Sequence, residues 1–258
     1  MQVGHAEVKP IRVGDVELYY AEAGRGEAVV CVHGGLGDLT YWDDQLPAFA
    51  RRWRAVTYSR RYCWPNSNLQ FDPAYSPLTD SHDLENLIAA LGLGPVHVVA
   101  ASVGGCAALF LAVRRPDLIR TLTLAEPPML RWARATPEGE ADWQAWIANV
   151  WQPAAAAFEA GEFPTAVAYF IDAFLGPGGF AQLPPRVQGR IIRNARDLEA
   201  QVLSSDPFPD LPIGQVAQIS VPVLLLSGGR SRRPHNIIDA MLAERLPRVE
   251  RIIVPKAS

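Results

Sequence analysis

The sequence predicts an α/β fold with a mostly parallel, doubly wound sheet and one long helical insertion. Short runs rich in valine and leucine, such as those at 28–32 and 96–99, alternate with segments of helical pattern, as expected of parallel strands that are covered on both faces. From residue 129 to residue 212 the strand pattern disappears, and apolar side chains recur at helical spacing instead. We therefore expect an α/β core built from residues 1–128 and 213–258, and a helical cap formed by residues 129–212.

The N-terminal part of the core is expected to begin with a β-hairpin. Apolar residues recur from Ile11 to Tyr20 and are interrupted by the turn pair Gly14-Asp15, which is typical of a hairpin at a sheet edge. Apolar runs and helix-capping residues then predict, in order, a strand at 28–32, a helix from Thr40 to Phe49, a strand at 53–58 and a helix from Thr79 to Gly92.

The remaining elements follow the same criteria. A strand at 119–125 ends at Glu126-Pro127-Pro128, and three helical faces follow within the predicted cap, beginning near Trp143, Val167 and Val187. The sheet resumes with a strand at 221–227, a helix at 237–246 and a last strand at 249–254.

The segment after the strand at 53–58 carries Arg60, Arg61 and Trp64. These side chains could face a functional site, but we expect them on the surface, where long charged side chains usually lie.

A buried strand turns into a helix with almost no loop at Ser102. The valines of the strand at 96–100 lead into Ala100-Ala101-Ser102-Val103-Gly104, and a helix of small and apolar residues follows as far as Arg114. Such a junction forces its central residue into a strained conformation, and small neighbours two positions away on each side make room for it. The hydroxyl of Ser102 is then raised above the sheet edge beside the free N–H groups of the helix N-terminus, which suits a nucleophile that generates an oxyanion. Ser102 could instead simply cap the helix.

The AASVG segment resembles the GxSxG nucleophile elbow of the α/β-hydrolases, with Ala100 in place of the first glycine. A second motif, His33-Gly34-Gly35 directly after the strand at 28–32, is similar to the loop that supplies an oxyanion N–H in that family. The resemblance implies that Ser102 is the nucleophile, that the N–H groups of Gly35 and Val103 form the oxyanion hole, and that His33 holds the loop in place without acting as a base.

The catalytic acid is expected to be Glu126. The family commonly places this acid after the seventh strand in a pattern similar to GxxD, but the present chain has Ser231 at that point, and serine cannot carry the charge. Glu126 follows the preceding strand, at the carboxyl end where a crevice is expected. Asp239 is the second candidate, although it falls within a predicted helix.

The catalytic base is expected to be a histidine in a loop after the last strand. The sequence ends at Pro255-Lys256-Ala257-Ser258, and the resemblance implies that further residues, including this histidine and a final helix, follow Ser258. The chain without that histidine is expected to be inactive. Among the histidines present, His235 is the nearest substitute.

The composition favours a small-molecule enzyme of the cytoplasm. The chain carries 24 Lys and Arg against 27 Asp and Glu, a net charge of −3, and no basic run that would suggest nucleic acid or an anionic membrane. No signal peptide or membrane span is evident. The three cysteines are far apart and lack metal-ligand spacing, so we expect reduced thiols, with no metal and no cofactor. The oligomeric state remains open.

The expected function is hydrolysis of a small-molecule ester, lactone or thioester through an acyl-enzyme. Trp143 and Trp146 of the predicted cap are expected to contribute to substrate binding, because apolar side chains line most ligand pockets. Two alternatives use the same residues: a cofactor-free lyase or haloperoxidase, and a ligand-binding homologue that has lost catalysis.

Overall fold

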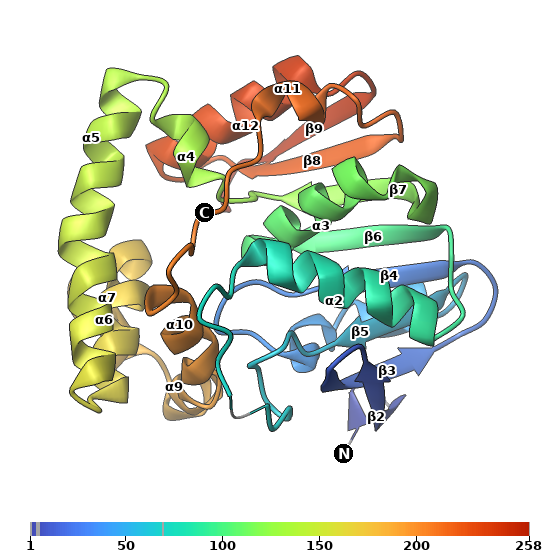
Figure 1. The fold of residues 1–258 in the computed structure, drawn as a ribbon, viewed down its shortest axis with the longest axis horizontal. Coiled ribbons are helices and arrows are strands. Elements are labelled where there is room, and N and C mark those ends of the chain that lie inside the picture. Colours follow the sequence, from blue (N-terminus) through green and yellow to red (C-terminus); the bar gives the residue numbers. More distant parts are fainter. Residues whose placement is uncertain (1, 4–5, 69, 258) are drawn as a thin grey trace.

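The computed structural model describes residues 2–3, 6–68 and 70–257 of the 258-residue chain. These residues form one nine-stranded sheet with helices on both faces, and a further group of helices lies beside the sheet (Figure 1). This architecture confirms the predicted α/β fold class.

The strand order in the sheet is β1-β2-β3-β5-β4-β6-β7-β8-β9. The pairs from β1 to β5 are antiparallel, and every pair from β5 to β9 is parallel. The predicted hairpin is β2 and β3, paired from Val8↔Ala21 to Val13↔Val16. The strands are β1 (Gln2–Val3), β2 (Ala6–Val13), β3 (Val16–Ala23), β4 (Ala28–Val32), β5 (Arg54–Tyr58), β6 (Val96–Ala101), β7 (Ile119–Ala125), β8 (Val223–Gly228) and β9 (Val249–Val254).

Helices cover both faces of the parallel part of the sheet. Val30, Val98 and Leu122 point into the main apolar core, which α2, α3 and α12 complete. On the opposite face Val29 and Cys31 pack against η1 and α1. The helices of the α/β core, on both faces of the sheet, are η1 (Leu39–Trp42), α1 (Leu46–Phe49), α2 (Pro77–Ala90), α3 (Val103–Arg114), η2 (Pro116–Leu118) and α12 (Arg233–Arg245).

Several predicted helix starts differ from the structure; the helix expected at 237–246, for example, begins at Arg233, with Pro234 in its first turn. The helix expected from Thr40 to Phe49 is two short helices, because Pro47 favours the first turn of a helix and a new one begins at Leu46. The helix expected from Thr79 begins at Pro77 instead, since Ser76 is its N-cap and Thr79 completes a capping box.

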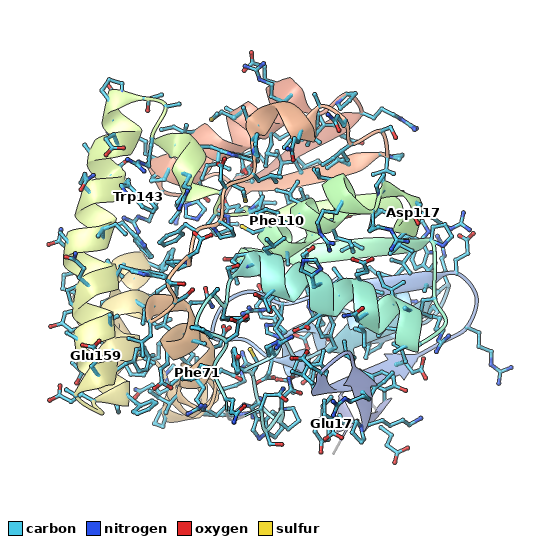
Figure 2. The ribbon with its side chains drawn as sticks, viewed as in Figure 1. Glu17, Phe71, Phe110, Asp117, Trp143 and Glu159 are labelled. Atoms are coloured by element: carbon cyan, nitrogen blue, oxygen red, sulfur yellow. The ribbon has the colours of Figure 1, made fainter. Side chains whose placement is uncertain are left out.

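Between β7 and β8 the chain forms only helices. Most of them pack around a separate apolar cluster, which contains Trp151, Phe158 and Leu198 together with Leu36 from the loop after β4. At the two ends of this stretch, Trp132 and Val216 belong to the main core instead. Figure 1 shows α5, α6 and α7 as a layer beside one end of the sheet, and Figure 2 places Trp143 on α5 within it. The helices are α4 (Leu130–Ala133), α5 (Pro137–Trp146), η3 (Ile147–Trp151), α6 (Gln152–Glu159), α7 (Phe163–Leu175), α8 (Gly179–Gln182), α9 (Pro185–Ile192), α10 (Ala195–Val202) and α11 (Ile213–Val216). We call residues 129–212 the helical segment.

Among the described residues, none of the helices combines the length and the apolar character that crossing a membrane requires.

Candidate active site

A pocket lies between the carboxyl ends of the central strands and the helical segment. It contains about 960 Å³ of space free of protein atoms, counting its open mouth. Gly35, Ser102 and Val103 line its floor, and Trp143 and Trp146 line it from the helical segment. The structure therefore brings five of the predicted site residues to one cavity, although they come from distant parts of the sequence.

Ser102 occupies the sharp turn between β6 and α3. Its φ of 51° and ψ of −128° lie outside the regions that L residues favour. The turn is held by hydrogen bonds on both sides: the Ser102 N–H donates to the Ala125 carbonyl at 2.8 Å, and the Gly105 N–H donates to the Ser102 carbonyl at 2.7 Å. A strained residue persists only when its surroundings fix it, and such residues cluster at active sites.

Two glycines allow the loop after β4 to approach this turn. A Cβ on Gly104 would lie 2.5 Å from the His33 carbonyl oxygen, and a Cβ on Gly34 would lie 3.1 Å from Cβ of Ser102. The small residues of the two motifs thus let two backbone segments meet at the nucleophile candidate.

Gly35 and Val103 lie next to each other at the pocket floor. An ideal Cβ on Gly35 would be 3.8 Å from Cγ1 of Val103. Val103 is also the first residue of the twelve-residue helix α3, and the first N–H groups of a helix have no partner within the helix. The positive end of the helix dipole therefore faces the pocket beside Ser102.

His33 is fully buried and binds two backbone groups. Its Nε2 accepts the Arg60 N–H at 3.0 Å, and its Nδ1 lies 2.8 Å from the Gly34 carbonyl oxygen. Burial lowers the pKa of His33 to about 4, and the charge of Arg60 acts in the same direction. The ring is therefore neutral, with Nδ1 donating to Gly34, and it lies outside the pocket lining.

Glu126 lies at the end of β7 in a left-handed conformation, with φ of 50°. Its carboxylate accepts the Gly228 N–H at 2.8 Å and the hydroxyl of Ser231. Ser231, which stands where the resemblance leads one to expect an aspartate, thus hydrogen-bonds the carboxylate that the sequence predicts as the replacement.

His235 is the one histidine of the described residues that lines the pocket. Burial lowers its pKa, and the charge of Glu126 acts against that shift. Asp239, the second candidate acid, is buried on α12 and accepts a 2.5 Å hydrogen bond from the Ser227 hydroxyl. Neither Asp239 nor Glu126 is among the residues that line the pocket.

Aromatic side chains form one part of the pocket wall, which also includes Leu198, Asp142 and Gln201. The indole of Trp146 contacts Trp151, Phe170 and Phe174, and Trp143 and Trp151 both contact Phe208. The guanidinium of Arg232 lies over the rings of Trp146 and Phe174 at 5.4 and 5.7 Å. Phe208 and Arg232 were not among the predicted site residues. Neither lies on one of the predicted helical faces, so no local pattern in the sequence connects them with Trp143 and Trp146.

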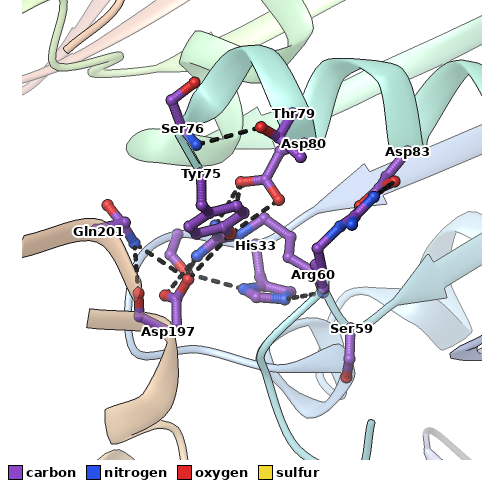
Figure 3. Close-up of polar contacts among 12 residues, drawn as sticks. His33, Ser59, Arg60, Tyr75, Ser76, Thr79, Asp80, Asp83, Asp197 and Gln201 are labelled. Atoms are coloured by element: carbon purple, nitrogen blue, oxygen red, sulfur yellow. Dashed lines mark hydrogen bonds and ion pairs between the residues drawn. The ribbon is translucent and has the colours of Figure 1, made fainter. Parts of the chain in front are cut away.

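A buried polar cluster adjoins the pocket (Figure 3), and its member Asp197 is one of the residues that line the pocket. The expectation that Arg60 lies on the surface is wrong: the side chain is fully buried and pairs with Asp80 of α2 and Asp197 of α10, each at 2.6 Å. The hydroxyl of Tyr75 carries one proton and lies 2.9 Å from Oδ1 of Asp80 and 3.3 Å from Oδ1 of Asp197, so it donates mainly to Asp80. Two counter-charges from distant segments make burial of the guanidinium possible. We call Arg60, Tyr75, Asp80 and Asp197 the Arg60 cluster.

A strained serine at a strand-to-helix turn, facing a pocket beside free backbone N–H groups, is the arrangement of the α/β-hydrolase class. Residues 27–258 match the family described as "alpha/beta hydrolase fold". The chain belongs to this family.

Two relatives illustrate the similarity in sequence. The chain is 32% identical over 135 residues to the protein named "Putative carbamate hydrolase RutD" of Caulobacter vibrioides, a match that covers 50% of this chain and 48% of the relative. It is 26% identical over 125 residues to the 2-hydroxy-6-oxo-6-phenylhexa-2,4-dienoate hydrolase of Comamonas testosteroni, covering 47% of this chain and 44% of the relative. The matches thus span about half the length of these curated relatives.

Solved structures resemble the whole described fold. An enol-lactonase from Burkholderia xenovorans superposes with a TM-score of 0.76 at 18% identity, covering 96% of this chain and 92% of that one. The carboxylesterase CesB from Bacillus subtilis has a TM-score of 0.74 at 16% identity, with 98% and 84% covered. At these identities the similarity concerns the fold.

Proposed function

We propose that the protein hydrolyses an ester, lactone or thioester bond of a small molecule, with Ser102 as the nucleophile. The single observation that carries the proposal is the strained Ser102 turn, which faces the pocket beside Gly35 and Val103. Family membership and the hydrolase names among the relatives support the reaction class.

In the proposed reaction the Ser102 oxygen attacks the carbonyl carbon while a histidine accepts the hydroxyl proton. The N–H groups of Gly35 and Val103 bind the resulting oxyanion. Collapse of the tetrahedral intermediate expels the alcohol or thiol, which takes the proton from the histidine, and leaves an acyl-enzyme. A water molecule then attacks the acyl carbon and releases the acid.

Glu126 is the proposed acid that stabilises the protonated histidine. Two candidates exist for the histidine itself. One is His235, which lines the pocket; burial lowers its pKa, and the charge of Glu126 opposes that shift. The other is the histidine that the resemblance predicts beyond Ser258.

Residues 129–212 are proposed to form a cap that selects substrates with a bulky apolar or aromatic group. Trp143 and Trp146 are the proposed substrate contacts, supported by the aromatic wall to which they belong. Burial of such a group against aromatic side chains would favour binding by about 25 cal/mol for each Å² of apolar surface removed from water.

The central test is Ser102→Ala measured with p-nitrophenyl butyrate. We expect kcat to fall by about a million-fold, in effect to background, and labelling by a fluorophosphonate probe to disappear. Ser220→Ala is the matched control, because Ser220 is exposed and lies outside the pocket lining. Turnover that survives in Ser102→Ala would contradict the proposal.

Two further measurements separate the alternatives. His235→Gln should abolish turnover if His235 is the base, and should leave most of it if the base lies elsewhere. Binding of butyrate esters by wild-type protein without product release would favour a ligand-binding homologue, and products other than acid and alcohol would favour a lyase or haloperoxidase.

A further inference from the structure

The loop that carries Gly35 is held by a carboxylate from the helical segment. The backbone N–H of Leu36, the residue after Gly35, donates to Oδ2 of Asp197 at 3.1 Å. Asp197 lies on α10 and is 161 residues away in sequence. The same oxygen accepts Nη2 of Arg60 at 2.6 Å, while Oδ1 accepts Nε2 of Gln201 at 3.0 Å. Three donors thus fix the orientation of this fully buried carboxylate, and the Tyr75 hydroxyl lies 3.3 Å from Oδ1.

Leu36 needs such a restraint because its backbone is strained. Its φ is 55°, a conformation that costs a β-carbon residue about 1–3 kcal/mol and persists only where the surroundings impose it. Its side chain is also buried within the apolar cluster of the helical segment. Both the backbone and the side chain of Leu36 are therefore attached to residues outside its own loop.

We infer that Asp197 is a positioning residue for the oxyanion hole: by binding the Leu36 N–H it keeps the preceding Gly35 in the orientation that faces Ser102. The inference rests on the proposed function, since an oxyanion hole has a role only if Ser102 reacts. It assigns to the helical segment a part in organising the reaction centre, in addition to covering the pocket.

Asp80 provides a matched comparison. Both Asp80 and Asp197 are buried, both pair with Arg60 at 2.6 Å, and both lie within hydrogen-bonding distance of the Tyr75 hydroxyl, which is nearer to Asp80. Asp197 alone of the two accepts an N–H from the Gly35 loop. Loss of either carboxylate removes one of two counter-charges of Arg60, whereas only loss of Asp197 releases Leu36. Asp197 also lines the pocket and Asp80 does not, so its loss changes the pocket wall as well, an effect on substrate binding that KM reports separately from kcat.

The experiment compares wild type, Asp197→Ala, Asp197→Asn and Asp80→Ala in the full-length protein. Steady-state kinetics with p-nitrophenyl butyrate gives kcat and KM, and hydrogen exchange reports on the amides of residues 34–37. We expect Asp197→Ala to lower kcat by about 10- to 100-fold with little change in KM, and to accelerate exchange in that segment. Asp197→Asn keeps an oxygen that can accept the Leu36 N–H and should recover most of kcat, and Asp80→Ala should stay close to wild type in both measurements.

Equal losses in Asp197→Ala and Asp80→Ala, or no loss in Asp197→Ala, would overturn the inference, because the cluster would then act only through stability. If Asp197→Ala does not fold, Asp197→Ser takes its place with the same expectation, since its shorter side chain keeps a hydroxyl in the cluster without reaching Leu36. A wild-type protein without turnover would refute the proposed function, while the exchange measurement would still decide whether Asp197 restrains the Gly35 loop.

Discussion

Three side-chain-bearing residues with positive φ occur among the described residues: Leu36, Ser102 and Glu126. Each belongs to a different loop, and all three loops meet at the carboxyl ends of β4, β6 and β7. A positive φ costs such residues free energy. Its occurrence in three loops that converge at one edge of the sheet indicates that the surrounding structure imposes these backbone conformations at the candidate site. The candidate site is therefore visible in the backbone before any side chain is considered.

Glu126 provides a prediction at the scale of one residue. Glu126→Gln keeps the oxygen that accepts from Gly228 and Ser231 but removes the charge. We expect kcat on p-nitrophenyl butyrate to fall by about 1,000- to 10,000-fold, as for other triads that lose the acid's charge. Asp239→Asn is the control, and a larger loss in the control than in Glu126→Gln would identify Asp239 as the acid.

The lowered pKa of His33 leads to a prediction of how the free energy of unfolding depends on pH. Its pKa falls from an ordinary 6.5 to about 4 because the ring is buried, so between these values the unfolded chain binds a proton that the folded chain does not. The neutral, buried His33 therefore contributes to the free energy of unfolding. This contribution is complete above pH 6.5, is lost as the pH falls toward 4, and amounts to on the order of 3 kcal/mol. Urea unfolding across this range should show a shallower acid loss for His33→Gln than for wild type, and identical slopes would contradict the assigned pKa.

At the scale of elements, β6 and α3 form the support of the nucleophile candidate. The helix packs in the main core, and its second residue, Gly104, touches the backbone of the loop after β4. The elbow therefore depends on the contact between two elements as much as on the strain within its own turn.

Gly104→Ala should destabilise the protein. The added methyl would lie 2.5 Å from the His33 carbonyl oxygen, in a backbone contact that cannot shift easily, and overpacking of this kind costs about 1–3 kcal/mol. Gly189→Ala is a matched control within α9, because nothing lies within 4 Å of its added methyl; alanine should stabilise that helix by about 0.5–1 kcal/mol. Urea midpoints that move in the same direction for both variants would argue against the close contact.

At the scale of the whole molecule, the ion pairs that join the helical segment to the rest of the fold include Arg60–Asp197, Arg233–Asp142 and Arg193–Asp38. Arg60–Asp197 is fully buried, whereas Arg233 of α12 pairs with Asp142 of α5 near the surface. Burial makes the first pair a structural requirement, because an unpaired charge in the interior is costly, whereas solvent screens the second.

The two arginines should consequently behave differently when replaced. Arg60→Met leaves Asp80 and Asp197 buried without a counter-charge and should cost about 3–5 kcal/mol of unfolding free energy. Arg233→Met should leave the thermal midpoint within experimental error. A comparable loss in both variants would show that the exposed pair, too, holds the helical segment in place.

The sequence by itself determined the elements whose signals are local: the strand periodicity, the start of α3, and the serine, glycine and glutamate positions at strand ends. These follow from contacts within a few residues, so pattern and turn chemistry suffice. Only the tertiary structure decided that Arg60 is buried, that Phe208 completes the aromatic wall and that Asp197 reaches Leu36. Arg60 meets Asp80 across 20 residues and Asp197 across 137, and no local pattern carries such pairings, because the burial energy that joins them arises only when the segments pack together.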